Sequence, residues 1–180
     1  MIYQISYQTD KYNHFFEANN EITKKIHHRV LRDEHINLFL KEFGYYEWFK
    51  SLKIHPTRKY AEKAILCDVI RLLYLYEFGG VYVDADVIFS ENVIKLEKCL
   101  RIKYGERNIS LVNNSLFFIR GIKHSPYLNH LINCYRKATY LYLDVEMLKN
   151  RNLVEYKDEV TIISKDFLKT FFTHEQLTTK

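Results

Sequence analysis

Two carboxylates separated by one residue, Asp84 and Asp86, follow a short run of β-forming residues, Val81–Val83. Side chains two positions apart on an extended chain lie on one face, so both acids can reach the same cleft. Oxygen ligands at this density suit Mn²⁺ or Mg²⁺, which leave coordination positions open for phosphate oxygens. Paired acids are also common in surface turns that have no function, so the residues around them must decide the interpretation.

A second pair of charged residues, Asp68 and Arg71, lies three positions apart on a predicted helix. Residues at this spacing project from one face of a helix. The pair could be an exposed salt bridge, worth about 0.2–0.5 kcal/mol, or it could face a pocket. The apolar neighbours Val69, Ile70 and Leu72 make the pocket at least as good an interpretation as the surface.

Predicted helices and strands place these charged groups near one another. Ile2–Gln8 reads as a first strand, and Asp33–Phe43 as an amphipathic helix that Gly44 ends. The longest helical pattern runs from Thr57 to Phe78 and stops at two glycines, after which the strand leading to the acids begins. The acids therefore stand at the end of a buried strand.

The rest of the chain adds strands at Ile109–Val112, Leu116–Ile119 and Val160–Ile163, and a helix at Pro126–Tyr135. Strands that alternate with helices are typical of a layered α/β domain with a mostly parallel sheet. Since no repeat or linker interrupts the pattern, we expect one domain over residues 1–180. Ligands of such sheets bind at the carboxyl ends of strands, where the paired acids lie.

The central segment is similar to a known family motif. Ala64–Arg71 followed by Leu75–Asp86 resembles the pattern A-x-x-S-D-x-x-R…L-Y-x-x-G-G-x-Y-x-D-x-D of glycosyltransferase family 32, which has a DXD sugar-binding region. That family includes yeast Golgi mannosyltransferases and bacterial capsular polysaccharide transferases. Ile2–Thr9 is similar to its first-strand motif I-P-K-I-I-H-Q-T, with Tyr7 at the His position. The likeness covers about residues 1 to 135.

The resemblance implies a GT-A-like nucleotide-sugar-binding domain, with a mostly parallel central sheet flanked by helices. It implies a metal-dependent retaining transfer of a hexose from a UDP- or GDP-sugar to a glycan, polysaccharide or lipid-linked acceptor. The metal expected from the resemblance is Mn²⁺, with Mg²⁺ as the alternative. The catalytic residues that it implies are Asp68, Arg71, Asp84 and Asp86.

Within that set, the family's helix acid and arginine contact sugar hydroxyls and phosphate, and its DXD acids bind ribose, sugar and metal. Asp86 is therefore the expected metal ligand, with Asp84 beside it and nearer the ribose and sugar. The further donor-binding positions that lie in the matched motifs are Tyr7, Gln8, Gly80 and Ala85.

Two assignments rest on less regular parts of the likeness. Asn114, or Asn113 if the register slips by one, falls where the family has an Asn facing the donor sugar, although either could be a plain turn residue. His174 is the candidate metal ligand in place of the family's C-terminal His-rich segment, although a His near a terminus is usually solvated. Cys67 replaces the family's Ser, and His124 stands in a turn that we interpret as structural.

The composition limits the other functions. The formal charge of +5 is scattered along the chain, so we do not expect nucleic acid as a partner. Three cysteines without CxxC spacing predict neither a disulfide framework nor a zinc site. Neither an export signal nor a run of about 18 apolar residues is present, so we expect a cytoplasmic protein. Any membrane association would come from the basic surface or from a partner subunit.

Two alternative functions stay open. Val81–Val87 also resembles the start of haloacid-dehalogenase-type phosphatases, but the G-D acid segment of those enzymes is missing after Asp86. A degenerate transferase that serves as a binding subunit is the second alternative, since the family's Ser-Trp terminus is absent. Trp48 could stack an acceptor sugar or simply pack between helices, and His27–Arg32 could hold phosphate or form a solvated basic edge.

Overall fold

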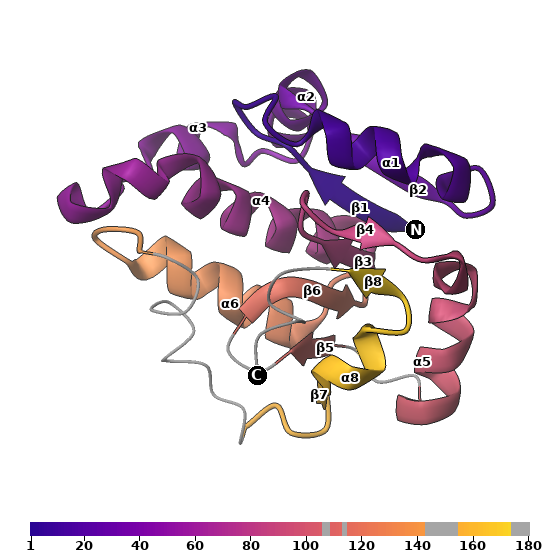
Figure 1. Cartoon of the computed structure of the whole chain (residues 1–180). Helices are drawn as coiled ribbons and strands as arrows, with labels where there is room; N and C mark the ends of the chain where they lie inside the picture. The colour runs from indigo at the N-terminus through magenta and orange to yellow at the C-terminus, as the bar shows by residue number, and fades with distance from the viewer. Residues whose placement is uncertain (106–108, 113–114, 143–154, 174–180) are drawn as a thin grey trace.

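The computed structural model in Figure 1 describes residues 1–105, 109–112, 115–142 and 155–173. A six-stranded sheet at its centre has the strand order β2-β1-β3-β6-β5-β7. The strands are β1 (Ile2–Ile5), β2 (His28–Leu31), β3 (Gly80–Val83), β5 (Ile109–Val112), β6 (Ser115–Gly121) and β7 (Val160–Ile163). β1 pairs in parallel with β2 and β3, and β5 with β7, while β6 runs antiparallel between β3 and β5.

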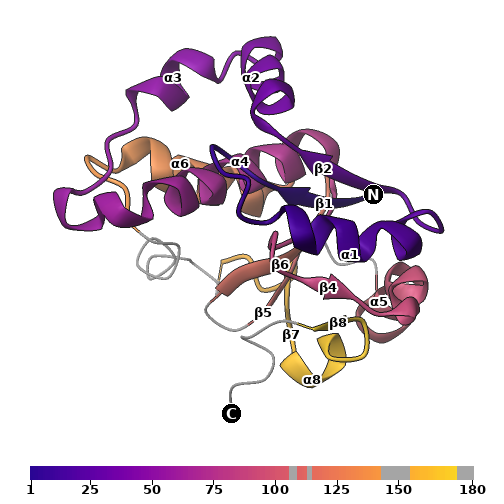
Figure 2. The ribbon, with the colours of Figure 1, turned by 45° about the horizontal axis from the view of Figure 1, so that its top comes forward.

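Helices cover both faces of this sheet, as Figures 1 and 2 show. One face carries α2 (Asp33–Glu42), α3 (Tyr46–Ser51), α4 (Glu62–Phe78) and α6 (Pro126–Lys137). The other carries α1 (Asn13–Thr23), the short helix η2 (Glu91–Lys95), α5 (Leu96–Tyr104), α8 (Lys165–Leu168) and a small sheet of β4 (Ile88–Phe89) with β8 (Phe172–Thr173). The predicted α/β architecture is confirmed, and it is consistent with a GT-A-like fold.

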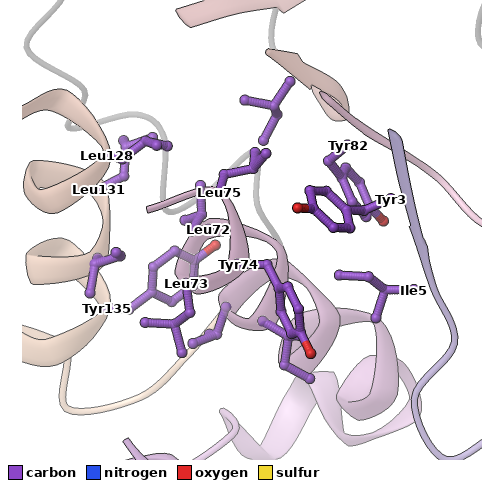
Figure 3. Close-up of a cluster of buried hydrophobic side chains, with 14 of the residues drawn as sticks. Tyr3, Ile5, Leu72, Leu73, Tyr74, Leu75, Tyr82, Leu128, Leu131 and Tyr135 are labelled. Atoms are coloured by element: carbon purple, nitrogen blue, oxygen red, sulfur yellow. The ribbon is translucent and has the colours of Figure 1, made fainter. Parts of the chain in front are cut away.

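The helix α4 is buried on most of its circumference because it lies between the sheet and α6. Figure 3 shows its leucines between Leu128 and Leu131 of α6 and the rings of Tyr3 and Tyr82 on the sheet. Complete burial of a leucine or isoleucine side chain contributes about 1.5–3 kcal/mol. Burial of this kind fixes α4 against β1 and β3, which are the strands that lead to the site.

The boundaries of the first strand and of the longest helix differ from the predicted ones. The first strand ends at Ile5 rather than Gln8, because Gln8 has a φ of +55° and the chain turns away from the sheet there. The helix predicted over residues 57–78 begins as the 3₁₀-helix η1 (Pro56–Ala61), and α4 continues from Glu62. The predicted helix before Gly44, which has a φ of +72°, is confirmed as α2.

Several predicted features outside the site are also decided by the structure. The two strands predicted after residue 108 are β5 and β6, and the later helix and strand are α6 and β7. All three cysteines are free thiols, as the spacing predicts. Among the described residues, the helices are too short or too polar to span a bilayer.

Candidate functional site

Three segments converge at one edge of the sheet. β1 and β3 are parallel neighbours, with Ile2 opposite Val81 and Tyr3 opposite Tyr82, so both strands end at the same edge. α4 joins β3 through two glycines and runs back across the sheet, so the first half of the helix lies over that edge. The loop after β1, the start of α4 and the end of β3 therefore enclose one cleft.

The cleft has a volume of about 130 Å³. Sites that enclose a complete small ligand commonly measure about 300–1,000 Å³, so this cleft fits one part of a nucleotide sugar, such as the sugar or a phosphate. The residues that line it are Ile5, Tyr7, Thr9, Tyr12, Lys63, Ala64, Cys67, Arg71, Tyr82, Asp84, Ala85 and Asp86. Most of the residues singled out by the sequence motif thus meet at one cavity.

The paired acids lie on a tight turn that follows β3. The amide of Asp84 donates to the carbonyl of Phe117 over 2.9 Å, which extends the pairing with β6 by one residue. The amide of Val87 then donates back to the carbonyl of Asp84 over 3.2 Å and closes the turn. Asp84 and Asp86 both line the cleft because the chain turns here, and not because an extended strand alternates its side chains.

Arg71 joins two carboxylates that come from different segments. Its guanidinium bonds Asp68 on the same helix and lies 3.2 Å from Oδ1 of Asp84 on the turn. The side chains of Arg71 and Asp68 are 7% and 5% exposed, so the alternative of a solvated surface bridge is wrong. Arg71 lines the cleft, whereas Asp68 lies behind it and bonds its guanidinium.

Tyr82, on β3, completes the surroundings of this ion pair. Its hydroxyl donates to Oδ1 of Asp84 over 2.9 Å, and its ring lies 4.5 Å from the Arg71 guanidinium. Burial raises the pKa of Tyr82 well above its ordinary value, and the neighbouring Asp84 raises it further, against the opposing effect of Arg71. The phenol therefore stays protonated and acts as a hydrogen-bond donor.

Two residues of the cleft have no signal in the sequence. Tyr12 stands in a loop and lines the cleft, and its pKa is raised by burial and then by the negative charge of Asp86. Lys63 lies one position before the matched motif, and its ammonium group donates a hydrogen bond to the carbonyl of Gln8. Cys67 has a thiol whose pKa burial raises to about 12, so it is protonated and a poor nucleophile.

The other predicted donor-binding residues are placed unequally. Tyr7 lines the cleft, with its ring edge-on to Phe49. Gln8 lines an adjacent polar cleft, where its backbone amide donates a hydrogen bond to Oδ1 of Asp33 over 2.7 Å. Gly80 starts β3, at the end of the strand remote from the acids, and it lies against the carbonyl of Met1.

Some candidates lie elsewhere or cannot be placed. Asn113, Asn114 and His174 fall outside the residues that the structure describes. Trp48 packs against Arg136, with the guanidinium 5.2 Å from its ring, which favours its packing interpretation. His124 bonds a glutamate near the last turn of α4, in agreement with a structural role.

The acids of the cleft suit a cation that takes only part of its coordination from protein. Within the described ranges, three or more His, Cys, Asp or Glu side chains do not gather into a closed metal cage. Mg²⁺ and Mn²⁺ bind readily to one or two carboxylates and complete their octahedron with phosphate oxygens and water. Oδ1 of Asp84 bonds both Arg71 and Tyr82, and Asp86 lines the same cleft.

The chain is similar to one protein family and to a solved structure. Residues 4–107, more than half of the chain, match the family described as "Glycosyltransferase sugar-binding region containing DXD motif". A solved structure described as "PaToxG Glycosyltransferase" is similar to the chain with 17% identity and a TM-score of 0.43. The similarity covers 83% of this chain and 63% of that one, so the chain spans less than two thirds of its relative. No curated protein matches the chain.

Proposed function

Because the chain belongs to the family of glycosyltransferase sugar-binding regions that contain a DXD motif, we propose that it transfers a hexose from a nucleoside-diphosphate sugar to a glycan, polysaccharide or lipid-linked acceptor. The observation that carries the proposal is the position of Arg71, which lies in the cleft and bonds the first acid of the motif. We assign the chain to glycosyltransferase family 32, and residues 1–180 to a single catalytic domain.

The charge balance of the cleft supports a divalent cation. Among the described residues that line the cleft or lie directly behind it, the carboxylates of Asp68, Asp84 and Asp86 outnumber the cationic groups of Arg71 and Lys63. A diphosphate donor carries further negative charge, and bringing it to a partly desolvated, acidic cleft would be unfavourable. We propose that Asp86, with Asp84 beside it and His174 as a third candidate, holds Mn²⁺ or Mg²⁺ there. When bound, such an ion acts as a Lewis acid toward the departing diphosphate.

The protein groups divide the remaining tasks. Arg71 would face the diphosphate, because its guanidinium is held rigidly at the cleft wall between Asp68 and Asp84. Preorganised charge of this kind stabilises a transition state without reorganisation during the reaction. Asp68 is buried behind the guanidinium, so it would act as a positioning residue for Arg71 rather than touch the sugar.

The donor sugar and nucleotide would bind around the loop after β1. Tyr7, Thr9 and Tyr12 line the cleft on that side, and Ala85 lies between the two acids. The polar cleft next to Gln8 includes Arg32 and Asp33 and shares Thr9 with this wall. We propose that Tyr7, Gln8, Ala85 and the undescribed Asn113 and Asn114 contribute to donor binding, and that Gly80 serves the fold alone.

The proposed reaction retains the anomeric configuration. The acceptor oxygen forms its bond to the anomeric carbon on the face from which the diphosphate oxygen departs. The electron pair of the broken bond stays on the diphosphate, which then takes the acceptor proton. A separate protein base is not needed in this scheme, and among the residues that line the cleft Cys67 is unsuitable as a base since its thiol is protonated at neutral pH.

A panel of nucleotides tests the proposal. The melting temperature is measured with UDP, GDP and their glucose, galactose, mannose and N-acetylhexosamine derivatives, each with Mn²⁺ and with EDTA. Slow hydrolysis of each donor is followed in parallel. We expect one nucleotide series to raise the melting temperature only when Mn²⁺ is present, since a ligand of the folded state stabilises it by mass action.

The alternatives predict other results. A phosphatase of the haloacid-dehalogenase type would release phosphate from an aryl phosphate, whereas a degenerate transferase would bind a nucleotide and leave every donor intact. Absence of both nucleotide binding and donor hydrolysis across the whole panel would overturn the transferase proposal.

A further inference from the structure

Two amide side chains are buried directly beneath the turn that carries the acids. Gln4 on β1 and Asn19 on α1 have no exposed surface, although both are polar. They lie among apolar residues of the second core, which includes Val87 and Phe89. A polar group removed from water in such surroundings is costly unless it forms hydrogen bonds. The hydrogen-bond partners of Gln4 and Asn19 therefore indicate which part of the structure these two residues stabilise.

The partners are backbone atoms of the acidic turn and of the strand after it. Nε2 of Gln4 donates to the carbonyls of Asp84 and Val87, over 3.0 and 3.2 Å. Nδ2 of Asn19 donates to the same Val87 carbonyl over 3.0 Å, and its Oδ1 accepts from the amide of Phe89 over 2.8 Å. Gln4 thus bonds the backbone on both sides of Asp86, and Asn19 bonds the backbone that follows it.

A third polar residue closes the network. Oε1 of Gln4 accepts from Nδ2 of Asn19 over 3.2 Å and is 3.0 Å from Nε2 of His28 on β2. Gln4 then uses both of its donors and both lone pairs of its oxygen, so its orientation is fixed. The same arrangement requires a proton on Nε2 of His28. Because each member is satisfied by the others, the turn cannot shift without breaking several bonds at once.

From this geometry we infer that Gln4 and Asn19 are positioning residues, which hold the turn so that Asp86 reaches the metal and Asp84 reaches Arg71. The inference rests on the proposed function. It goes beyond fold stability because the two amides bond the backbone immediately around the acids, and not a remote part of the core. Outer-shell partners of this kind commonly change metal affinity or activity about 10–100-fold when they are removed.

The test compares Mn²⁺ binding by near-isosteric variants. Gln4→Met and Asn19→Leu remove the hydrogen bonds while they roughly keep the side-chain volume. Free Mn²⁺ is measured by electron paramagnetic resonance in the presence of UDP or GDP, whichever the wild type binds, at a temperature where each variant is folded by circular dichroism. We expect the dissociation constant for Mn²⁺ to rise about tenfold or more in both variants.

A matched control separates positioning from stability. Ser125 stands at the start of α6, away from the turn. It is 2% exposed, and its hydroxyl donates a hydrogen bond to Glu159. Ser125→Ala should lower the melting temperature and leave the Mn²⁺ dissociation constant unchanged. If Gln4→Met and Asn19→Leu also leave that constant unchanged, the amides serve stability alone and the inference is wrong.

A milder variant keeps the test decisive if those two fail to fold. Asn19→Ser keeps a neutral hydroxyl near these partners but shortens the side chain and leaves fewer hydrogen bonds, so we expect a weaker but measurable loss of Mn²⁺ affinity, about threefold or more. An unchanged affinity in this folded variant would also overturn the inference. If the wild type binds no Mn²⁺ with any nucleoside diphosphate, the proposed function fails, and this inference with it.

Discussion

Arg71 on α4 lies 3.2 Å from Oδ1 of Asp84, and this contact ties the central helix to the turn after β3. The same guanidinium bonds Asp68 one helical turn earlier. A helix, a strand end and a turn are thereby joined at one charged group.

Replacement of Arg71 should be strongly destabilising. Arg71→Met leaves the buried carboxylate of Asp68 without its cation, and removing one partner of a buried pair commonly costs about 3–5 kcal/mol. Urea unfolding should show this loss. The double variant Asp68→Asn with Arg71→Met also removes the buried carboxylate charge and should recover part of the lost stability. Equal stability of the single and double variants would contradict the buried pairing.

Loss of the Tyr82 hydroxyl should have a smaller effect. Tyr82→Phe keeps the ring beside the Arg71 guanidinium and removes the donor to Asp84. Hydrogen bonds to charged groups contribute about 1.5–3 kcal/mol, and partial exposure of Asp84 reduces this to about 1–2 kcal/mol. Tyr140→Phe, at a ring that is 41% exposed, is the control and should leave the unfolding free energy unchanged. A similar result for both variants would argue against the bond to Asp84.

The buried His28 predicts a loss of stability in mild acid. Burial lowers its pKa from 6.5 to about 4 in the folded protein. Between these two values the unfolded chain binds more protons, so stability falls as the pH drops from about 6.5 to about 4. The difference corresponds to about 3 kcal/mol at most. Unfolding of His28→Gln should show a shallower pH dependence in that window, and an identical slope in both proteins would contradict the assignment.

Gly80 should tolerate no side chain. It has a φ of +110°, and an added Cβ would lie 2.7 Å from the carbonyl oxygen of Met1. Strain and overlap together should make Gly80→Ala destabilising by about 3 kcal/mol or more. Gly44, with a φ of +72° and open space around it, is the matched control, and its replacement by alanine should cost about 1–2 kcal/mol. Equal losses at the two positions would contradict the close approach.

Much of the site was predictable because its residues are close in sequence. The run from Asp68 to Asp86 crosses one helix, two glycines and one strand, so local patterns indicate which elements bear the charges. What the pattern left open was whether Asp68 and Arg71 face solvent. That depends on the packing of α4 between the sheet and α6, which residues distant in sequence supply.

The supporting network was not predictable for the same physical reason. Gln4, Asn19 and His28 are polar residues in separate elements, and nothing in their spacing shows that they meet beneath the acidic turn. α1 was missed as well, since only Phe16 and Asn19 of its residues are buried and it has no side-chain cap at its start. Two-residue strands such as β4 exist only through their partner, here β8.

Donor hydrolysis by Asp86→Asn tests the central claim most directly. With the nucleotide sugar that the wild type accepts and with Mn²⁺ in excess, we predict that kcat falls about 100–1,000-fold, equivalent to about 2.7–4 kcal/mol in the barrier. Stability in EDTA should stay within about 0.5 kcal/mol of the wild type, and Asp166→Asn, at an exposed acid on α8, should keep full activity. A loss of kcat below tenfold would contradict the role of Asp86 as the metal-binding acid of a glycosyltransferase site.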